Sequence, residues 1–188
     1  MRCLLLMFST ALLVPAQQAP AVGVETAWDA RKLIADAVKA NSDLRPVLNA
    51  LHPQEWVEKK GAPGAYTIQW QAAQDQLRYT ETTGAAAAQH VENLPAILEL
   101  YYRMEALEST ARSVAQGAAQ YAPRADSDKL SQWAGKAFEA RRRLREYIQD
   151  LAASLQQNFK IADQEAQRCR GMITKTPEAP ATRRPLRK

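Results

Sequence analysis

The sequence predicts an all-α protein, folded as an up-and-down bundle of four main helices with a kinked first helix and a long, coiled-coil-like last helix. Apolar residues recur every three or four positions through residues 26–173, which is the period of one helical face. No proline interrupts the interval between Pro123 and Pro177, so one helix can run through most of it. The connections between the periodic segments are short, which favours antiparallel neighbours. We therefore expect one helical bundle domain over residues 26–173.

The first helix is predicted to begin at Thr26, whose spacing from Asp29 is that of a capping box. Pro46 interrupts the apolar face behind it, because its ring and its missing N–H disfavour a helical bond to the carbonyl of Ser42. We expect either a kink near Asn41 or a new helix capped by Ser42.

A single helical turn is expected at residues 52–56, followed by a break at residues 61–64, which contain two glycines and a proline. The second main helix follows from Tyr66. The third helix opens at Asn93, a favoured N-cap, and Pro123 closes it. Two exposed ion pairs at i,i+4 spacing are expected on the third helix: Glu99 with Arg103, and Glu108 with Arg112.

The last helix is predicted to begin near Asp126 and keeps a heptad pattern of apolar residues. At ~1.5 Å per residue it would be roughly 70 Å long, against roughly 35 to 45 Å for the second and third helices. It must therefore either break or project beyond its neighbours and pack on the first helix or on another copy of the chain. The candidate self-association residues in its final part are Phe159, Ile161, Ala162, Cys169 and Ile173.

Residues 1–16 have the pattern of a secretory signal peptide, in which Arg2 precedes an apolar run that ends in small residues before Gln17. The run is shorter than the ~20 residues that cross a bilayer, so the chain is not expected to span a membrane after cleavage. Residues 17–25 carry no periodic pattern and are interpreted as a flexible leader. These features predict a secreted or periplasmic protein.

Cleavage after residue 16 would remove Cys3 and leave Cys169 as the only cysteine. An intramolecular disulfide is then impossible. Cys169 either cross-links two copies through their last helices or, as the pattern favours, lies buried as a small apolar side chain.

The chain carries a formal net charge of +5, and most of it lies at the C-terminus. The last fifteen residues contain five basic side chains and one glutamate, whereas residues 3–173 balance to zero. Residues 174–188 contain three prolines and one large apolar residue, which is typical of a disordered tail. The neutral body gives no reason to expect specific nucleic-acid binding. The basic tail either solubilises the protein or contacts polyanions, with candidate contacts at Arg183, Arg184, Arg187 and Lys188.

The densest charge cluster of the body, at residues 141–145, is interpreted as a solvated face because acidic partners stand one turn away. Arg143 is expected to pair with Glu139, and Arg142 with Glu146. A contact with phosphate groups is the less favoured interpretation.

Signatures of catalysis and of cofactor binding are missing from the sequence. It contains no C-x-x-C-H haem motif, no Glu-x-x-His pair for a di-iron centre, no H-E-x-x-H zinc motif, no phosphate-binding glycine loop and no G-x-S-x-G elbow. His52 and His90 stand at predicted helix ends, where a histidine usually caps the helix or is solvated. The sequence therefore predicts no cofactor, no metal site and no enzymatic activity.

The large aromatic residues support two interpretations. They line a pocket for a small apolar ligand between helices, or, as their helical spacing favours, they pack in the core. The candidate pocket residues are Trp28, Trp70, Tyr101 and Trp133.

The general pattern resembles that of small exported bacterial helical proteins, although no motif defines a family. The leading hypothesis is an exported, non-enzymatic interaction protein of the cell envelope. It would use its helix surfaces, above all the projecting end of the last helix, to pair with itself or with an envelope protein. The alternative hypothesis is a carrier that binds a small apolar ligand in an aromatic-lined bundle core.

Overall fold

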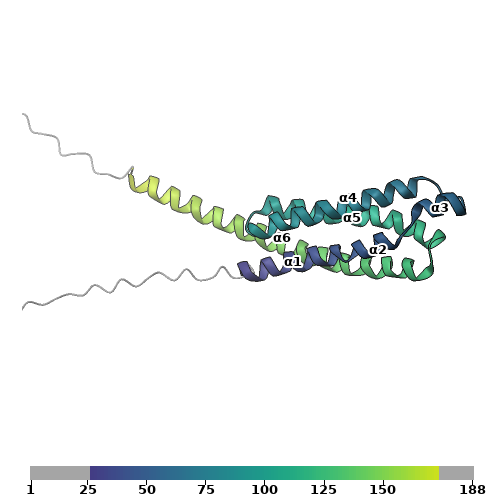
Figure 1. Cartoon of the computed structure of the whole chain (residues 1–188). Helices are drawn as coiled ribbons and strands as arrows, with labels where there is room; N and C mark the ends of the chain where they lie inside the picture. The colour runs from purple at the N-terminus through teal and green to yellow at the C-terminus, as the bar shows by residue number, and fades with distance from the viewer. Residues whose placement is uncertain (1–25, 174–188) are drawn as a thin grey trace, which may run out of the picture.

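The computed structural model describes residues 26–173, and over this range the protein is a helical bundle (Figure 1). The helices are α1 (Ala27–Ser42), α2 (Leu44–Ala50), α3 (Pro53–Lys60), α4 (Ala65–Gln89), α5 (Leu94–Tyr121) and α6 (Arg124–Ile173). Both α1 and α5 pack on α4 and on α6, so the long helices form a closed ring. The predicted four-helix architecture is confirmed. The predicted signal peptide (1–16), leader (17–25) and tail (174–188) lie outside the described residues.

The interruption of the first helix is a break of one residue. α1 ends at Ser42, Asp43 keeps dihedral angles close to the helical region (φ −60°, ψ −14°), and α2 begins at Leu44. Pro46 lies in the first turn of α2, where its missing N–H costs no helical bond. The prediction that Ser42 caps a new helix is wrong. Because the chain never becomes extended here, the Ser42 hydroxyl instead donates a hydrogen bond of 2.8 Å to Glu81 of α4.

The segment that was expected to form a single turn is the two-turn helix α3. It runs from Pro53 to Lys60 and is capped by Gly61, whose φ of 67° favours glycine. The buried ring of Trp56 holds α3 against α4 and α5, because it lies 6.4 Å from the rings of both Tyr66 and Tyr121, centroid to centroid. The prediction of a single turn was too short, because it used the local pattern of residues 52–56 and could not include these contacts with α4 and α5.

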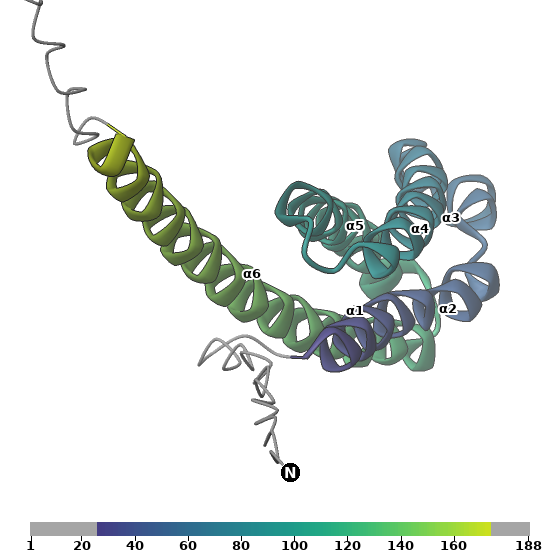
Figure 2. The same ribbon diagram turned by 90° about the vertical axis from the view of Figure 1, so that its left-hand side faces the viewer.

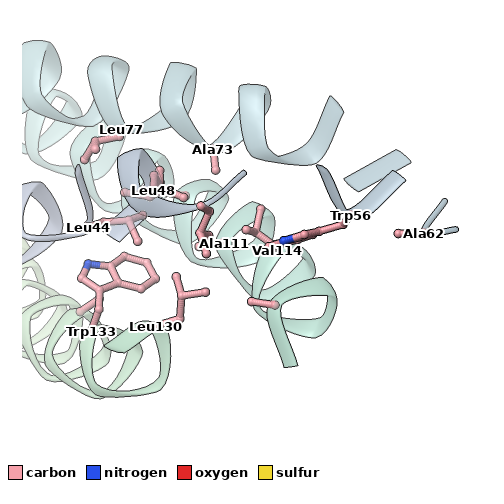
Figure 3. Packing of buried hydrophobic residues seen from close by; sticks show 14 residues of the cluster. Leu44, Leu48, Trp56, Ala62, Ala73, Leu77, Ala111, Val114, Leu130 and Trp133 are labelled. Carbon is pink, nitrogen blue, oxygen red and sulfur yellow. The ribbon is translucent and has the colours of Figure 1, made fainter. Parts of the chain in front are cut away.

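The core consists of two clusters of buried apolar residues. The first lies toward α3, and Figure 3 shows Leu44 and Leu48 of α2 on one side of it and Leu130 and Trp133 of α6 on the other. The second cluster lies toward the far end of the bundle and includes Ile34, Met104, Leu144 and Leu151. Leu151 is the last buried residue of α6 in the described chain. The bundle core therefore ends there, although the helix does not.

A largely buried ion pair joins α5 to α6. Arg141 donates two hydrogen bonds to Glu108, Nε to Oε1 at 2.7 Å and Nη2 to Oε2 at 3.0 Å, and a third to the hydroxyl of Tyr101 at 3.1 Å. The hydrogen bond to Glu108 raises the pKa of the Arg141 guanidinium above its usual value. The expected pair between Glu108 and Arg112 is not formed among the described residues, because Glu108 turns toward α6. The expected pair between Glu99 and Arg103 is confirmed at 2.8 Å.

The charge cluster at residues 141–145 is divided between two environments. Arg142 is on the exposed side, where it pairs with both Glu139 (2.9 Å) and Glu146 (2.5 Å). The predicted pair between Arg143 and Glu139 is not formed among the described residues, since Glu139 bonds to Arg142. Only Arg141 turns inward, so most of this cluster is a solvated face as expected.

Close approach of α1 and α4 at Gly84 gives a first testable prediction. A Cβ built at Gly84 would lie 2.1 Å from Cγ2 of Val38. We expect Gly84→Ala to lower the free energy of unfolding by about 1–2 kcal/mol, because overpacking outweighs the gain of about 1 kcal/mol in helix propensity. Gly135→Ala on α6 is the matched control, since a Cβ there meets nothing within 4 Å.

Urea unfolding of both variants measures the difference. The control is expected to gain about 0.5–1 kcal/mol. If Gly84→Ala gained as much as Gly135→Ala, the close packing of α1 on α4 would be refuted.

Candidate interaction surface

The last part of α6 projects beyond the other helices as a single exposed helix. Figures 1 and 2 show this part of α6 extending away from α1, α4 and α5. We call residues 152–173 the α6 extension; at ~1.5 Å per residue it is roughly 33 Å long. Of the ten exposed large hydrophobic side chains in the described chain, five belong to it, and Phe159 and Ile173 are each 73% exposed. Half of these exposed side chains thus lie on the part of α6 that extends past the other described helices.

The apolar residues of the extension form one stripe. Steps of four and three residues connect its members, which we call the extension stripe: Leu155, Phe159, Ala162, Ala166, Cys169 and Ile173. The same steps lead from Leu144 through Ile148 and Leu151 in the second core cluster to Leu155. The stripe therefore continues the face of α6 that packs on the bundle.

All five predicted self-association residues lie in the extension. Phe159, Ala162, Cys169 and Ile173 belong to the stripe, whereas Ile161 falls on another side of the helix and is 50% exposed. The favoured interpretation of Cys169 as a buried thiol is wrong for this chain, because its side chain is exposed.

Two members of the stripe, Leu155 and Ala166, were not among the predicted candidates. The sequence signal that identifies them is their spacing from Ala162: Leu155 lies seven residues before it and Ala166 four residues after it. Ala166 is small, and alanine alone gives a weak apolar signal.

The four candidate pocket residues lie in different environments. Trp28 is 67% exposed near the start of α1, and Trp133 is 5% exposed in the first core cluster. Trp70 packs against that first cluster and donates from Nε1 to the carbonyl of Leu48 at 2.8 Å. Tyr101 packs against the second cluster. The structure therefore brings Trp70 and Trp133 to one cluster but does not bring all four residues to one cavity.

Two grooves run between α1 and α6. One, of about 510 Å³, is lined in part by small and aliphatic residues, which include Leu33, Ala37, Ala40 and Gly135. The other, of about 490 Å³, lies at the end of the bundle where the α6 extension begins. We call it the acidic groove, because its charged side chains are four carboxylates and two bases: Asp29, Asp36, Glu146 and Asp150 with Lys32 and Arg143. Asp36 is paired with Lys32 at 2.7 Å and Glu146 with Arg142 at 2.5 Å, so Asp29 and Asp150 are the carboxylates of this groove that lie outside these ion pairs.

Other kinds of site were sought in the described part of the chain. Residues 26–173 contain no group of three or more His, Cys, Asp or Glu side chains placed to hold a metal ion. None of the helices within that range is both long enough and apolar enough to cross a membrane. The candidate polyanion contacts Arg183, Arg184, Arg187 and Lys188 lie outside the described residues.

Comparisons with protein-family models, with curated proteins and with solved structures gave no match to this chain. The fold and its exposed surfaces are therefore the observations from which a function can be argued. They define a four-helix bundle whose last helix presents an uncovered apolar stripe.

Proposed function

We propose that this protein is an exported, non-enzymatic interaction protein of the cell envelope, and that it pairs with itself through the α6 extension. The observation that carries the proposal is the extension stripe, which continues the core face of α6 for roughly 33 Å past the other helices of residues 26–173 and leaves Phe159 and Ile173 each 73% exposed. Export is supported by the signal-peptide pattern of residues 1–16.

Two physical arguments support a helical partner for this surface. Most helical stability in proteins comes from packing of an apolar face, so the extension lacks the packing that stabilises the rest of α6 in the described bundle. Contiguous exposed apolar surface of this kind marks interaction sites in soluble proteins. A second helix laid along the stripe would bury Phe159 and Ile173 and stabilise the extension at the same time.

Light scattering tests the proposal on the chain that begins at Gln17. We expect a dimer mass for the chain that ends at Lys188 and a monomer mass for a chain that ends at Leu155. The shorter chain retains every buried residue of α6, so its bundle core is preserved. A monomer mass for both chains would remove self-association.

A pair of single substitutions in the full chain tests whether the stripe makes the contact. Phe159→Glu places a charge on the stripe, and we expect it to raise the dissociation constant of the dimer by at least about tenfold. Ile161→Glu is the matched control, because Ile161 is also an exposed apolar residue of the extension but lies off the stripe. Equal effects of the two substitutions would show that a different face is used.

A further inference from the structure

We infer that the second copy packs on the extension stripe in the antiparallel orientation, so that each extension lies against the end of the other bundle. This inference rests on the proposed function and specifies the partner of the same surface. Three independent observations support it: the position of the bundle on α6, the order of side-chain sizes along the stripe, and the charge at the end of the bundle.

The position of the bundle disfavours a parallel pair. The core residues Leu144 and Leu151 lie on the face of α6 that the stripe continues, so α1 and α5 occupy that face up to the start of the extension. In a parallel pair both bundles would need the same space beside the two α6 helices. In an antiparallel pair the bundles would lie at opposite ends, and each extension would run along the part of α6 that the bundle of the other copy leaves uncovered.

The sizes of the stripe residues also favour the antiparallel orientation. A register centred between Ala162 and Ala166 pairs Leu155 with Ile173 and Phe159 with Cys169. A bulky ring then faces a small side chain, and the two central alanines allow close approach. A parallel register would pair Phe159 with Phe159 and Cys169 with Cys169, so its layers would differ more in size than those of the antiparallel register and would pack less well.

The charges at the two ends of the extension are complementary in this orientation. Ile173 of one copy would lie beside Leu155 of the other, close to the acidic groove, where Asp29 and Asp150 are the carboxylates available to a basic partner. The segment that follows Ile173, residues 174–188, has five basic side chains and one glutamate. Glu165, which stands beside the centre of the extension stripe, is paired with Arg168 of its own helix at 3.2 Å. Antiparallel pairing thus places the end of the described helix, from which this basic sequence continues, near the acidic groove of the other copy.

Disulfide trapping in the chain from Gln17 tests the orientation, because Cys169 is then the only native cysteine. In the antiparallel register two copies of Cys169 are separated by ten residues along the helix axis, about 15 Å, which exceeds the reach of a disulfide of about 7 Å between Cα atoms. Phe159→Cys adds a thiol opposite Cys169 of the partner. We expect this variant to form covalent dimers under mild oxidation at least about tenfold faster than the wild type.

The control combines Phe159→Cys with Cys169→Ser and should remain unlinked, like the wild type. Rapid linking of the wild type or of this control would overturn the antiparallel orientation, while a dimer mass in light scattering would leave the proposed function intact. If light scattering gave a dimer mass but the wild type, Phe159→Cys and the double variant all failed to form covalent dimers, this register would also be overturned. A monomer mass for the wild type would overturn the inference and the proposed self-association together.

Discussion

Trp133→Ala is expected to lower the free energy of unfolding by about 3–5 kcal/mol, the range for removal of a large aromatic side chain from a core. Trp133 is 5% exposed, lies beside Leu44 and Leu130 (Figure 3), and donates from Nε1 to the carbonyl of Ala40 at 3.1 Å. The substitution leaves a cavity between α1 and α6 and removes the part-buried hydrogen bond to Ala40. Chemical denaturation followed by circular dichroism measures the loss.

The matched control for this experiment is Trp28→Ala. Trp28 is 67% exposed, so we expect a change of no more than about 0.5 kcal/mol. The pair of variants separates the two interpretations of the tryptophans. If Trp133→Ala left stability unchanged, its side chain would not belong to the packed core, and the carrier hypothesis would regain support.

Arg141→Met is expected to lower the free energy of unfolding by about 2–4 kcal/mol. Methionine keeps an apolar stem of similar length but removes the guanidinium that donates two hydrogen bonds to Glu108. The Glu108 side chain is only 11% exposed, so its carboxylate would be left desolvated and without its partner. Thermal and urea unfolding of the variant check this result.

Arg112→Met provides the control, because the sequence predicted that Arg112, and not Arg141, would pair with Glu108. Arg112 is exposed on α5 and forms no ion pair within the described residues. We expect its replacement to change stability by no more than about 0.5 kcal/mol. A larger loss for Arg112→Met than for Arg141→Met would contradict the geometry that joins α5 to α6.

The helices could be predicted because their signals are local. Asn93 caps α5 as expected, with its side chain accepting a hydrogen bond of 3.3 Å from the backbone N–H of Ala96. The errors arose where tertiary contacts compete with local ones. Glu108 has a suitable partner one turn away in Arg112, but Arg141 reaches it from another helix in a largely buried position.

The candidate surface could be predicted only in part. The length of the last helix indicated that it would extend past its neighbours, and five candidate residues lie in that extension. Sequence spacing alone could not show that α6 stays continuous or that its core contacts end at Leu151. The acidic groove combines residues of α1 with residues of α6 that are more than a hundred positions away. A local sequence pattern cannot predict that such distant residues lie close together.

Hydrogen exchange at two protein concentrations, differing about a hundredfold, tests the central claim most directly. Self-association through the α6 extension predicts that the amides of residues 152–173 exchange at least about tenfold more slowly at the higher concentration, because a bound copy suppresses local opening. Amides in the core of the bundle should show no such dependence. Fast exchange of residues 152–173 at both concentrations would contradict the proposal that this helix is the interaction surface of the protein.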